Sequence, residues 1–497
     1  MTIRSEFIRE QKRYSKDFLK NLFDFDDEGF IEFVKKLKAY GVLKMVNVTS
    51  EQKDLSDLVE TDLEIVDIDF NDNFYYVFTF VGILTVGDIV LKCYPKYLLS
   101  NDEPFDEMKE ILKVLTKYDS KEHIIHFFNG YDEQKEFNLL AIMLYLIRDY
   151  NDYGVYLNQQ EVVETNGEGE ILWDNTINDT LALIINNRPF YTELQTVNSV
   201  NDESNYISRL HRFIISDCCQ RLKEMKLLDI FEIDEINISD ESIDDFGEDH
   251  YILYKLFKEL NMQYVTRKQV LLKTLYSYIA HRKSFREDLG LSMYGTNSFN
   301  LVWEKVCAQV FDNQLSTEIG KLNLPTDLQG NYKKRKDTIL SKIIDKPKWK
   351  SVDSEEGHPV EHTLTPDIVS LLETENGLWF CIFDAKYYNI VLNESELKNQ
   401  PGVGDVTKQY LYQLAYNDFI DNHSFSEDDV KNAFLMPSEK GYDEYIGKVE
   451  IEFFKELSNP PLKEISVIKL SARKIYSYYL NGDTFHFDED FIGMLKN

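Results

Sequence analysis

The chain has little of what marks a secreted, zinc-binding or membrane protein. Five cysteines occur in 497 residues, and none belongs to a Cys-x-x-Cys pair. An odd number without regular spacing is typical of reduced thiols, so we expect a cytoplasmic protein without structural zinc. The longest apolar run, residues 139–147, is too short to cross a bilayer and predicts a buried helix. The first residues also lack the apolar core of a signal peptide.

Phosphate-binding loops and long disordered tracts are missing too. No G-x-x-x-x-G-K-[ST] segment occurs, so we expect that this chain does not itself hydrolyse ATP or GTP. Glycine and proline are scarce, with 21 and 11 residues, which argues against long disordered regions. The length exceeds that of one ordinary hydrophobic core and predicts two or three domains.

Basic residues are in the minority. The chain has 55 Lys and Arg against 87 Asp and Glu, a formal net charge of −32. A uniformly acidic surface would repel nucleic acid, because neutralisation of phosphates dominates DNA affinity. Residues 321–350, the basic segment, reverse this balance with nine basic residues and three acidic ones. Such a stripe predicts DNA binding, with a solvated loop as the alternative. The densest part of the segment is Lys333-Lys334-Arg335-Lys336.

Residues suited to catalysis lie in the last third of the chain. Pro366-Asp367 precedes one apolar segment, Asp384-Ala385-Lys386 ends another, and Asn376-Gly377 stands between the two segments. Apolar segments on both sides of Asn-Gly predict a β-hairpin with a two-residue turn. In that register Asp367 lies opposite Lys386, and Asp384 points to the same face. The pattern therefore brings two carboxylates and an ammonium group together.

These groups suit metal-dependent hydrolysis of a phosphodiester. Mg²⁺ takes oxygen ligands, usually one or two carboxylates, and keeps several waters. We expect Asp367 and Asp384 to bind Mg²⁺, and Lys386 to position or help deprotonate the attacking water or to stabilise negative charge. The alternative is that all three are ordinary solvated groups at strand ends.

The P-D and D-x-K clusters resemble the PD-(D/E)xK nuclease superfamily, and a preceding segment strengthens the resemblance. Apolar residues between Phe299 and Phe311 recur at helical spacing, with Glu304 at the edge of the apolar stripe. Helices before the catalytic hairpin carry a metal-associated Glu in this superfamily. The resemblance therefore implies that Glu304 is a catalytic residue and metal ligand. The alternative is a glutamate at the margin of an amphipathic helix.

A second flanking segment, residues 405–416, resembles the helix that follows the D-x-K strand in these nucleases. The superfamily pattern is Q-x-x-x-Y, whereas Gln413 and Tyr416 are three residues apart here. Gln409, Gln413 and Tyr416 can still share a helix face. The resemblance implies a catalytic role for Gln413 and DNA contacts for Gln409 and Tyr416. Which glutamine corresponds to the motif residue stays open.

Further matches spread over most of the chain. Three further segments, the segment around Tyr294-Gly295-Thr296 and the D-A-K core together resemble the LlaJI family of restriction proteins. The members of this family are relatives of the McrC nuclease subunit. The resemblance implies a Mg²⁺-dependent subunit that cleaves double-stranded DNA together with a separate McrB-like AAA+ GTPase or ATPase, away from membranes. The other matching segments are Val81–Leu84, Leu91–Tyr97 and Asn166–Asp174.

We expect an α+β protein with several domains. Residues 1–165 are predicted to be an α/β region that docks the partner NTPase, residues 166–282 a mainly helical region, and residues 283–497 a restriction-endonuclease-like α/β nuclease domain. Within these, 1–60 and 174–225 are predicted to be helical, and 450–454 to be a strand. Two other functions remain open: a non-catalytic scaffold that activates the partner NTPase, and a stand-alone DNA exonuclease.

Overall fold

The computed structural model describes residues 3–47, 74–119, 138–157, 159–201, 205–282, 291–352, 357–374, 377–456 and 462–496. Contacts divide the chain into two compact units. The first unit consists of residues 1–5, 85–90 and 134–294, and the second of residues 6–84, 91–133 and 295–497. The second unit thus combines N-terminal residues with the C-terminal part of the chain. The three consecutive domains expected from the sequence stay a prediction.

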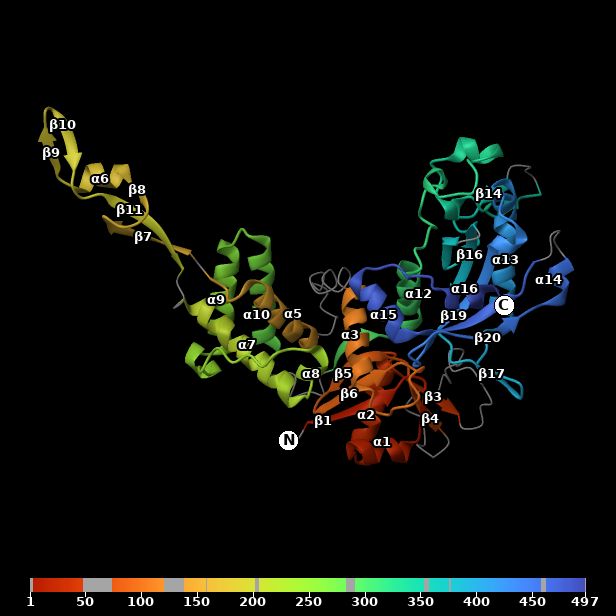
Figure 1. The fold of residues 1–497 in the computed structure, drawn as a ribbon. Helices are drawn as coiled ribbons and strands as arrows, with labels where there is room; N and C mark the ends of the chain where they lie inside the picture. Colours follow the sequence, from red (N-terminus) through yellow and green to blue (C-terminus); the bar gives the residue numbers. More distant parts are fainter. Residues whose placement is uncertain are drawn as a thin grey trace. The chain divides into compact units, whose positions relative to one another are not determined.

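A five-stranded mixed sheet forms the centre of the second unit, in the order β15-β16-β19-β21-β20 (Figure 1). β15 and β16 form the expected antiparallel hairpin, while β16, β19 and β21 run parallel. Parallel neighbours need a long crossover, and helix α13 (Val403–Asn422) lies between β16 and β19 in the chain. The strands are β15 (Ile368–Thr374), β16 (Gly377–Ala385), β19 (Val430–Ser438), β20 (Glu444–Val449) and β21 (Ile465–Ser471).

Helices cover both faces of this sheet, which explains why β19 is buried along its whole length. On one face, Phe380 of β16 packs against Tyr416 of α13. On the other face, Phe311 packs against Phe383, and the Trp303 indole donates a hydrogen bond to the Leu435 carbonyl at 3.1 Å. The helices of this second face are α12 (Phe299–Val310), α15 (Ala472–Asn481) and α16 (Glu489–Lys496).

The N-terminal part of the second unit is mixed rather than helical, so the prediction of a helical segment 1–60 is wrong for its described residues. Apolar side chains of α2 are buried beside a three-stranded sheet with the order β2-β4-β3. Another sheet, with the order β1-β6-β5-β12, contains residues that are assigned to both units. The elements are β1 (Arg4–Arg9), β2 (Arg13–Tyr14), α1 (Lys16–Phe23), α2 (Asp27–Ala39), β3 (Leu43–Asn47), β4 (Phe74–Phe78), β5 (Val81–Val86), β6 (Ile89–Tyr94), α3 (Phe105–Asp119) and β12 (Leu291–Thr296).

Helices make up about half of the described residues of the first unit. Their apolar faces are buried, including Leu256 of α9 and Leu275 of α10. The helices and helical turns are α5 (Leu139–Tyr153), α7 (Tyr206–Glu224), α8 (Leu228–Phe231), η2 (Ile243–Phe246), α9 (Asp249–Met262) and α10 (Thr266–His281).

The prediction of one helical stretch over 174–225 is wrong, because strands occupy residues 182–201. Asn186 and Asn187 both have positive φ angles, 51° and 61°. Two consecutive positive φ angles suit a tight hairpin turn, which asparagine tolerates. The elements here are β7 (Gln159–Thr165), β8 (Glu170–Ile171), α6 (Trp173–Asp179), β9 (Ala182–Ile185), β10 (Arg188–Tyr191) and β11 (Gln195–Asn201).

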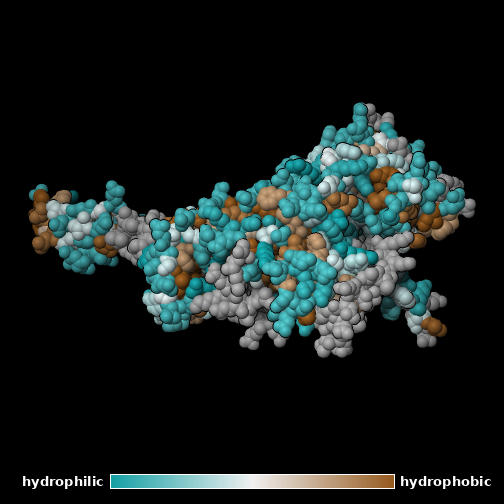
Figure 2. Space-filling model, turned by 90° about the horizontal axis from the view of Figure 1, so that it is seen from below, coloured by the Kyte–Doolittle hydropathy of each residue, from teal (hydrophilic) through white to brown (hydrophobic). Residues whose placement is uncertain are grey.

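The hairpin β9–β10 exposes apolar side chains. Leu183, Ile184 and Phe190 are 54%, 67% and 52% exposed. Figure 2 shows hydrophobic residues, in brown, gathered over these strands. Apolar patches of this kind differ from scattered exposed residues and are typical of surfaces that another molecule covers.

Short elements complete the second unit. The predicted strand 450–454 is wrong, since α14 (Glu452–Glu456) begins inside it. Among the described residues no helix has the length and apolar character needed to cross a membrane. The short elements are η3 (Ile319–Lys321), η4 (Gly330–Arg335), η5 (Leu340–Lys342), β13 (Lys348–Lys350), β14 (Gly357–Pro359), β17 (Val391–Asn393), β18 (Glu396–Lys398) and η6 (Glu427–Asp429).

Candidate active site

The β15–β16 hairpin has a different register from the one predicted. Thr374 pairs with Gly377, and Ile368 pairs with Phe383. Asn376-Gly377 is therefore not the two-residue connection, and Asn376 lies outside the described residues. Continued by one pair, this register brings Asp367 into line with Asp384 instead of Lys386. The shift is two residues, so every side chain keeps its predicted face.

Strand alternation explains why the acidic groups share one face. Val369 pairs with Ile382, and both belong to the core cluster that packs against α13. Two residues further on, Asp367 and Asp384 fall on the same face, where the apolar stretch ends. The Asp367 carboxylate accepts a hydrogen bond from the Ala385 N–H at 3.0 Å, which joins the two strand ends.

Asn313 fixes the main chain at Asp367. Its side-chain amide donates to the Asp367 carbonyl at 2.8 Å, and its carbonyl oxygen accepts from the Val369 N–H at 3.1 Å. One side chain thus pairs with the backbone on both sides of Ile368. Asn313 follows the end of α12, so the helix and the strand are held together next to the carboxylates.

Lys386 makes two ion pairs. Its ammonium group lies 2.9 Å from Asp384 Oδ2 and 3.1 Å from Asp405 Oδ1. Burial lowers the pKa of Lys386, but the charges of Asp384 and Asp405 outweigh this effect and raise the pKa above its ordinary value. Lys386 therefore stays protonated at neutral pH. In this state it is a charged hydrogen-bond donor to Asp384 and Asp405.

Negative charge accumulates at the strand ends. Burial, followed by the neighbouring charge of Asp384, raises the pKa of Asp367 well above its usual range. Burial also raises the pKa of Glu304, where Asp384 adds to the effect and Lys386 opposes it. Two carboxylates this close cannot both ionise without cost, and a divalent cation between them would remove that cost. The donor chemistry at this position therefore fits Mg²⁺.

The number of protein ligands is also compatible with that ion. In the part of the chain that the structure describes, no three His, Cys, Asp or Glu side chains gather closely enough to hold a metal by themselves. Mg²⁺ commonly uses one or two carboxylates and fills its other positions with water and substrate phosphate. Asp367 and Asp384 would supply such a pair. Glu304 lies within electrostatic reach of Asp384.

Gln409 and Tyr416, which are predicted to contact DNA, are both 0% exposed in this structure, and these contacts stay a prediction. Gln409 donates to the Ile382 carbonyl at 3.1 Å and to Asn432 at 2.6 Å, and so fastens α13 to the sheet. Gln413, 6% exposed, accepts a hydrogen bond from Asn432 at 3.4 Å. Both glutamines thus belong to a buried amide network, and the catalytic role of Gln413 stays a prediction.

The α13 residues that face the charged groups are Asp405 and Tyr412, which sequence reasoning missed. Burial and the charges of Asp384 and Asp367 raise the pKa of Tyr412 to about 12. The two residues are seven positions apart, two helical turns, and therefore share a face. The sequence does contain a signal for Asp405. It lies in the first turn of the helix, where the helix dipole favours a negative charge.

Comparison with known proteins identifies the family. The family model described as LlaJI restriction endonuclease matches residues 80–473. The chain belongs to the LlaJI restriction endonuclease family. The matched range includes all the predicted site residues, from Glu304 to Tyr416. A restriction endonuclease family is a family of nucleases, so DNA cleavage is the class of activity.

One curated relative of this LlaJI family member is the type II restriction enzyme BsuMI component YdjA of Bacillus subtilis (strain 168). It is 28% identical over 426 residues, 84% of this chain and 83% of the relative. Among solved structures, Thermococcus gammatolerans McrB AAA+ hexamers with bound McrC match with a TM-score of 0.37 at 12% identity, covering 96% of this chain and 99% of that chain. A second McrBC complex from that organism has a TM-score of 0.24 at 13% identity, covering 56% and 79%. These TM-scores are too low to support an argument.

In this LlaJI family member the basic segment is anchored, but most of its cations are free to face solvent. Tyr332 is buried and donates a hydrogen bond to Asp418 at 2.8 Å. Arg335 is half-buried, and its guanidinium donates to the Lys342 carbonyl at 3.0 Å. The three lysines, in contrast, are exposed. They are Lys333, Lys334 and Lys336.

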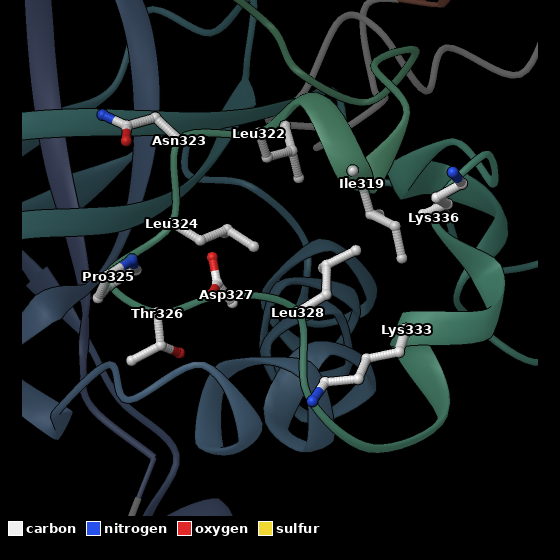
Figure 3. A pocket seen from close by; sticks show the side chains of 11 residues that line it. Ile319, Leu322, Asn323, Leu324, Pro325, Thr326, Asp327, Leu328, Lys333 and Lys336 are labelled. Atoms are coloured by element: carbon white, nitrogen blue, oxygen red, sulfur yellow. The ribbon is translucent and has the colours of Figure 1, made fainter.

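Two of these lysines line a pocket of about 530 Å³. Figure 3 shows Lys333 and Lys336 on the helical turn at one side of this pocket, with Leu324 and Leu328 pointing into it. Asp327 is also part of the lining. The pocket joins apolar and basic side chains, while Lys334 lies outside it. Arg335 donates a hydrogen bond within the basic segment, whereas Lys333, Lys334 and Lys336 are exposed. The three lysines are thus the side chains that can reach a phosphate from solvent.

Proposed function

We propose that this chain is the Mg²⁺-dependent endonuclease subunit of a restriction system and cleaves double-stranded DNA. The observation that supports it best is the arrangement at the ends of β15 and β16. Asp367 and Asp384 lie in register on one face, and Lys386 is ion-paired to Asp384 at 2.9 Å. This arrangement resembles the PD-(D/E)xK pattern and combines the groups that phosphodiester hydrolysis needs.

Each residue has a distinct task in this proposal. Asp367 and Asp384 would hold Mg²⁺, with Glu304 as a further ligand directly or through water, and the bound ion would activate a water and offset phosphate charge. Lys386, protonated, donates to a phosphate oxygen or to the attacking water. Asp405 keeps the Lys386 ammonium in place, and Asn313 holds the main chain of Asp367.

The proposed partner is a McrB-like AAA+ GTPase or ATPase. This chain lacks a phosphate-binding loop, and its net charge of −32 disfavours DNA binding by the chain alone. The relative from Bacillus subtilis is named as one component of a restriction enzyme. Docking of the partner through residues 1–165 stays a prediction. The exposed hairpin β9–β10 lies outside that range and is a further surface that a partner protein could cover.

Cleavage of a covalently closed circular DNA tests the proposal. The chain together with its NTPase partner, Mg²⁺ and nucleotide should linearise the circle, and EDTA should prevent this. The chain alone should cleave poorly and hydrolyse neither ATP nor GTP. Digestion restricted to linear DNA would favour the stand-alone exonuclease. Stimulation of the partner's NTP hydrolysis without any cleavage would favour the non-catalytic scaffold.

A further inference from the structure

The main chain at Lys386 is held by contacts from outside its own hairpin. β16 ends at Ala385, so Lys386 lies just beyond the last residue of the strand. The Lys386 N–H donates a hydrogen bond to the Leu435 carbonyl of β19 at 2.9 Å, which fixes the chain on one side. On the other side follows Tyr387, whose side chain is 6% exposed. The position of the Lys386 backbone therefore depends on the contacts of Tyr387.

N-terminal residues hold the Tyr387 hydroxyl. It donates a hydrogen bond to Glu10 Oε2 at 2.5 Å and accepts one from the Lys96 N–H at 3.3 Å. The Lys96 N–H also lies 3.3 Å from Glu10 Oε2, so the three groups form a closed triangle. Glu10 is 4% exposed. Burial raises the pKa of Glu10, while the Tyr387 hydrogen bond and the charge of Lys96 oppose this effect. The Tyr387 hydroxyl is thus satisfied both as a donor and as an acceptor.

Aromatic packing holds the ring of Tyr387. The centre of the Phe299 ring lies 5.4 Å from that of Tyr387, and the Tyr97 ring meets it edge-on at 6.3 Å. Phe299 is the first residue of α12, the helix that carries Glu304. Tyr387 therefore joins the end of β16 to α12 and to the N-terminal segment. A phenylalanine in its place would keep the ring contacts and lose only the hydroxyl.

The N-terminal segment is itself fastened to the central sheet and its helices. Glu439, which follows β19, accepts hydrogen bonds from the Leu99 N–H at 2.6 Å and the Ser100 N–H at 2.9 Å. The hydroxyl groups of Tyr97 and Tyr476, a residue of α15, are hydrogen-bonded at 2.9 Å. A support that is fixed to the same sheet can hold Tyr387 at a constant distance from the strand ends.

We propose that Glu10 is a positioning residue of the nuclease site, because it fixes the main chain at Lys386 through Tyr387. This proposal rests on the proposed nuclease function. A lysine side chain has a flexible four-carbon stem, so its ammonium group reaches its two ion-pair partners only if its backbone is correctly placed. A misplacement of about 1 Å can cost about 100-fold in rate. The N-terminal segment therefore forms part of the nuclease site, although it lies outside residues 283–497.

The test uses the full chain with its NTPase partner, Mg²⁺ and nucleotide, and measures the single-turnover rate of DNA cleavage at saturating enzyme. Tyr387→Phe and Glu10→Ala should each lower this rate by about 10- to 100-fold, because each removes the hydrogen bond. The enzyme concentration that gives half the maximal rate should change little, because no proposed DNA contact is altered.

Two further variants separate the hydrogen bond from other effects. Glu10→Gln should keep most of the wild-type rate, since its amide oxygen can accept in place of Oε2. The double variant Glu10→Ala/Tyr387→Phe should be no slower than the slower single variant, because both substitutions act through one contact. A Glu10→Gln variant as slow as Glu10→Ala, or fully additive losses in the double variant, would contradict the proposal.

Tyr156→Phe is the matched control. Tyr156 belongs to the first unit and is 2% exposed. Its hydroxyl donates to Glu259 at 2.6 Å and accepts from the Gln263 amide at 2.8 Å. The control therefore loses a buried hydrogen bond of the same kind, and its cleavage rate should stay at the wild-type value. A melting curve for each variant compares the losses of stability.

The outcomes separate the positioning role from the nuclease site itself. If Tyr387→Phe and Glu10→Ala cleave at the wild-type rate while Asp367→Asn does not cleave, the positioning proposal is wrong and the nuclease site still stands. If Tyr156→Phe slows cleavage as much as Tyr387→Phe, lost stability explains the effect and the positioning proposal is wrong. If Tyr387→Phe does not fold, Glu10→Ala decides the question from a different element. If Asp367→Asn cleaves normally, the nuclease site itself is wrong.

Discussion

The ends of β15 and β16 and the basic segment use charged residues in opposite ways. At the strand ends, the side chains of Asp384 and Lys386 are only 6% and 20% exposed, and each has a fixed ionic partner. In the basic segment, Lys333 and Lys334 are exposed on a helical turn. Buried charges are positioned by the fold, so each one is needed. Exposed charges act by summed attraction, so each one contributes a little.

The largest expected effect is therefore at the strand ends. Asp367→Asn should reduce cleavage by more than about 100-fold, because it removes a proposed metal ligand from a preorganised site. The melting temperature should not fall, since asparagine still accepts the Ala385 N–H bond and no longer repels Asp384. Cleavage of circular DNA in Mg²⁺, beside a melting curve, measures both effects.

Glu373→Gln is the matched control for that variant. Glu373 is an exposed acid at the other end of β15 and pairs with Leu378. Loss of the Glu373 charge should change neither the rate of DNA cleavage nor the melting temperature. Near-normal cutting by Asp367→Asn would remove this strand end from consideration as the active site.

A smaller effect, distributed over several residues, is expected in the basic segment. Lys333, Lys334 and Lys336 replaced together by Gln should lower the salt slope of DNA binding by up to about 2.7, or 0.9 for each phosphate contact. At low salt, kcat should stay close to the wild-type value, because no group at the strand ends changes. Binding of a labelled duplex at several salt concentrations gives the slope. An unchanged slope would make this segment an ordinary solvated loop.

Asp405 tests whether the ion pair positions Lys386. Asp405→Asn should lower kcat by about 10-fold with little change in KM, since the ammonium keeps only one of its two anionic partners. Loss of the Asp405 charge lowers the pKa of Lys386, so the alkaline limb of the kcat–pH profile should move to lower pH. Asp405→Glu should restore part of the activity. A pH profile identical to wild type would show that Asp405 does not act through Lys386.

Arg335→Gln should give the smallest effect on DNA binding. Its guanidinium donates to the Lys342 carbonyl, so the side chain stabilises the turn instead of facing solvent. We expect a loss of up to about 1 kcal/mol in the free energy of unfolding and a nearly unchanged salt slope. Urea denaturation measures the free energy of unfolding, and the DNA-binding assay measures the salt slope. A slope change as large as that of a lysine variant would contradict the distinction between Arg335 and its neighbours.

The sequence predicts which side chains share a face at the strand ends better than it predicts the exact register. Strand alternation places Asp367, Asp384 and Lys386 on one face whatever the turn, because a two-residue shift preserves the faces. The register itself was predicted from Asn376-Gly377, and the observed pairing of Thr374 with Gly377 differs from it. Turn chemistry is a local signal, whereas register also depends on packing against α13.

Other parts of the site depend on contacts that no local pattern contains. Gln409 suits a helix face near the site, yet it is buried against the Ile382 carbonyl because α13 packs closely on the sheet. Asp405 reaches Lys386 only through the crossover between β16 and β19. The hydrogen bond from the Tyr387 hydroxyl to Glu10 joins residues 377 positions apart. Tertiary structure alone brings these residues together.

The most direct test of the proposed metal site compares Mg²⁺ binding with cleavage in the same samples. Melting curves over a range of Mg²⁺ should show stabilisation of the wild type, about 2.7 kcal/mol at 100 times the dissociation constant. Asp384→Asn should lose both the stabilisation and DNA cleavage while remaining folded. Wild-type cleavage that persists in EDTA, or Mg²⁺-dependent cleavage by Asp384→Asn at the wild-type rate, would contradict the account.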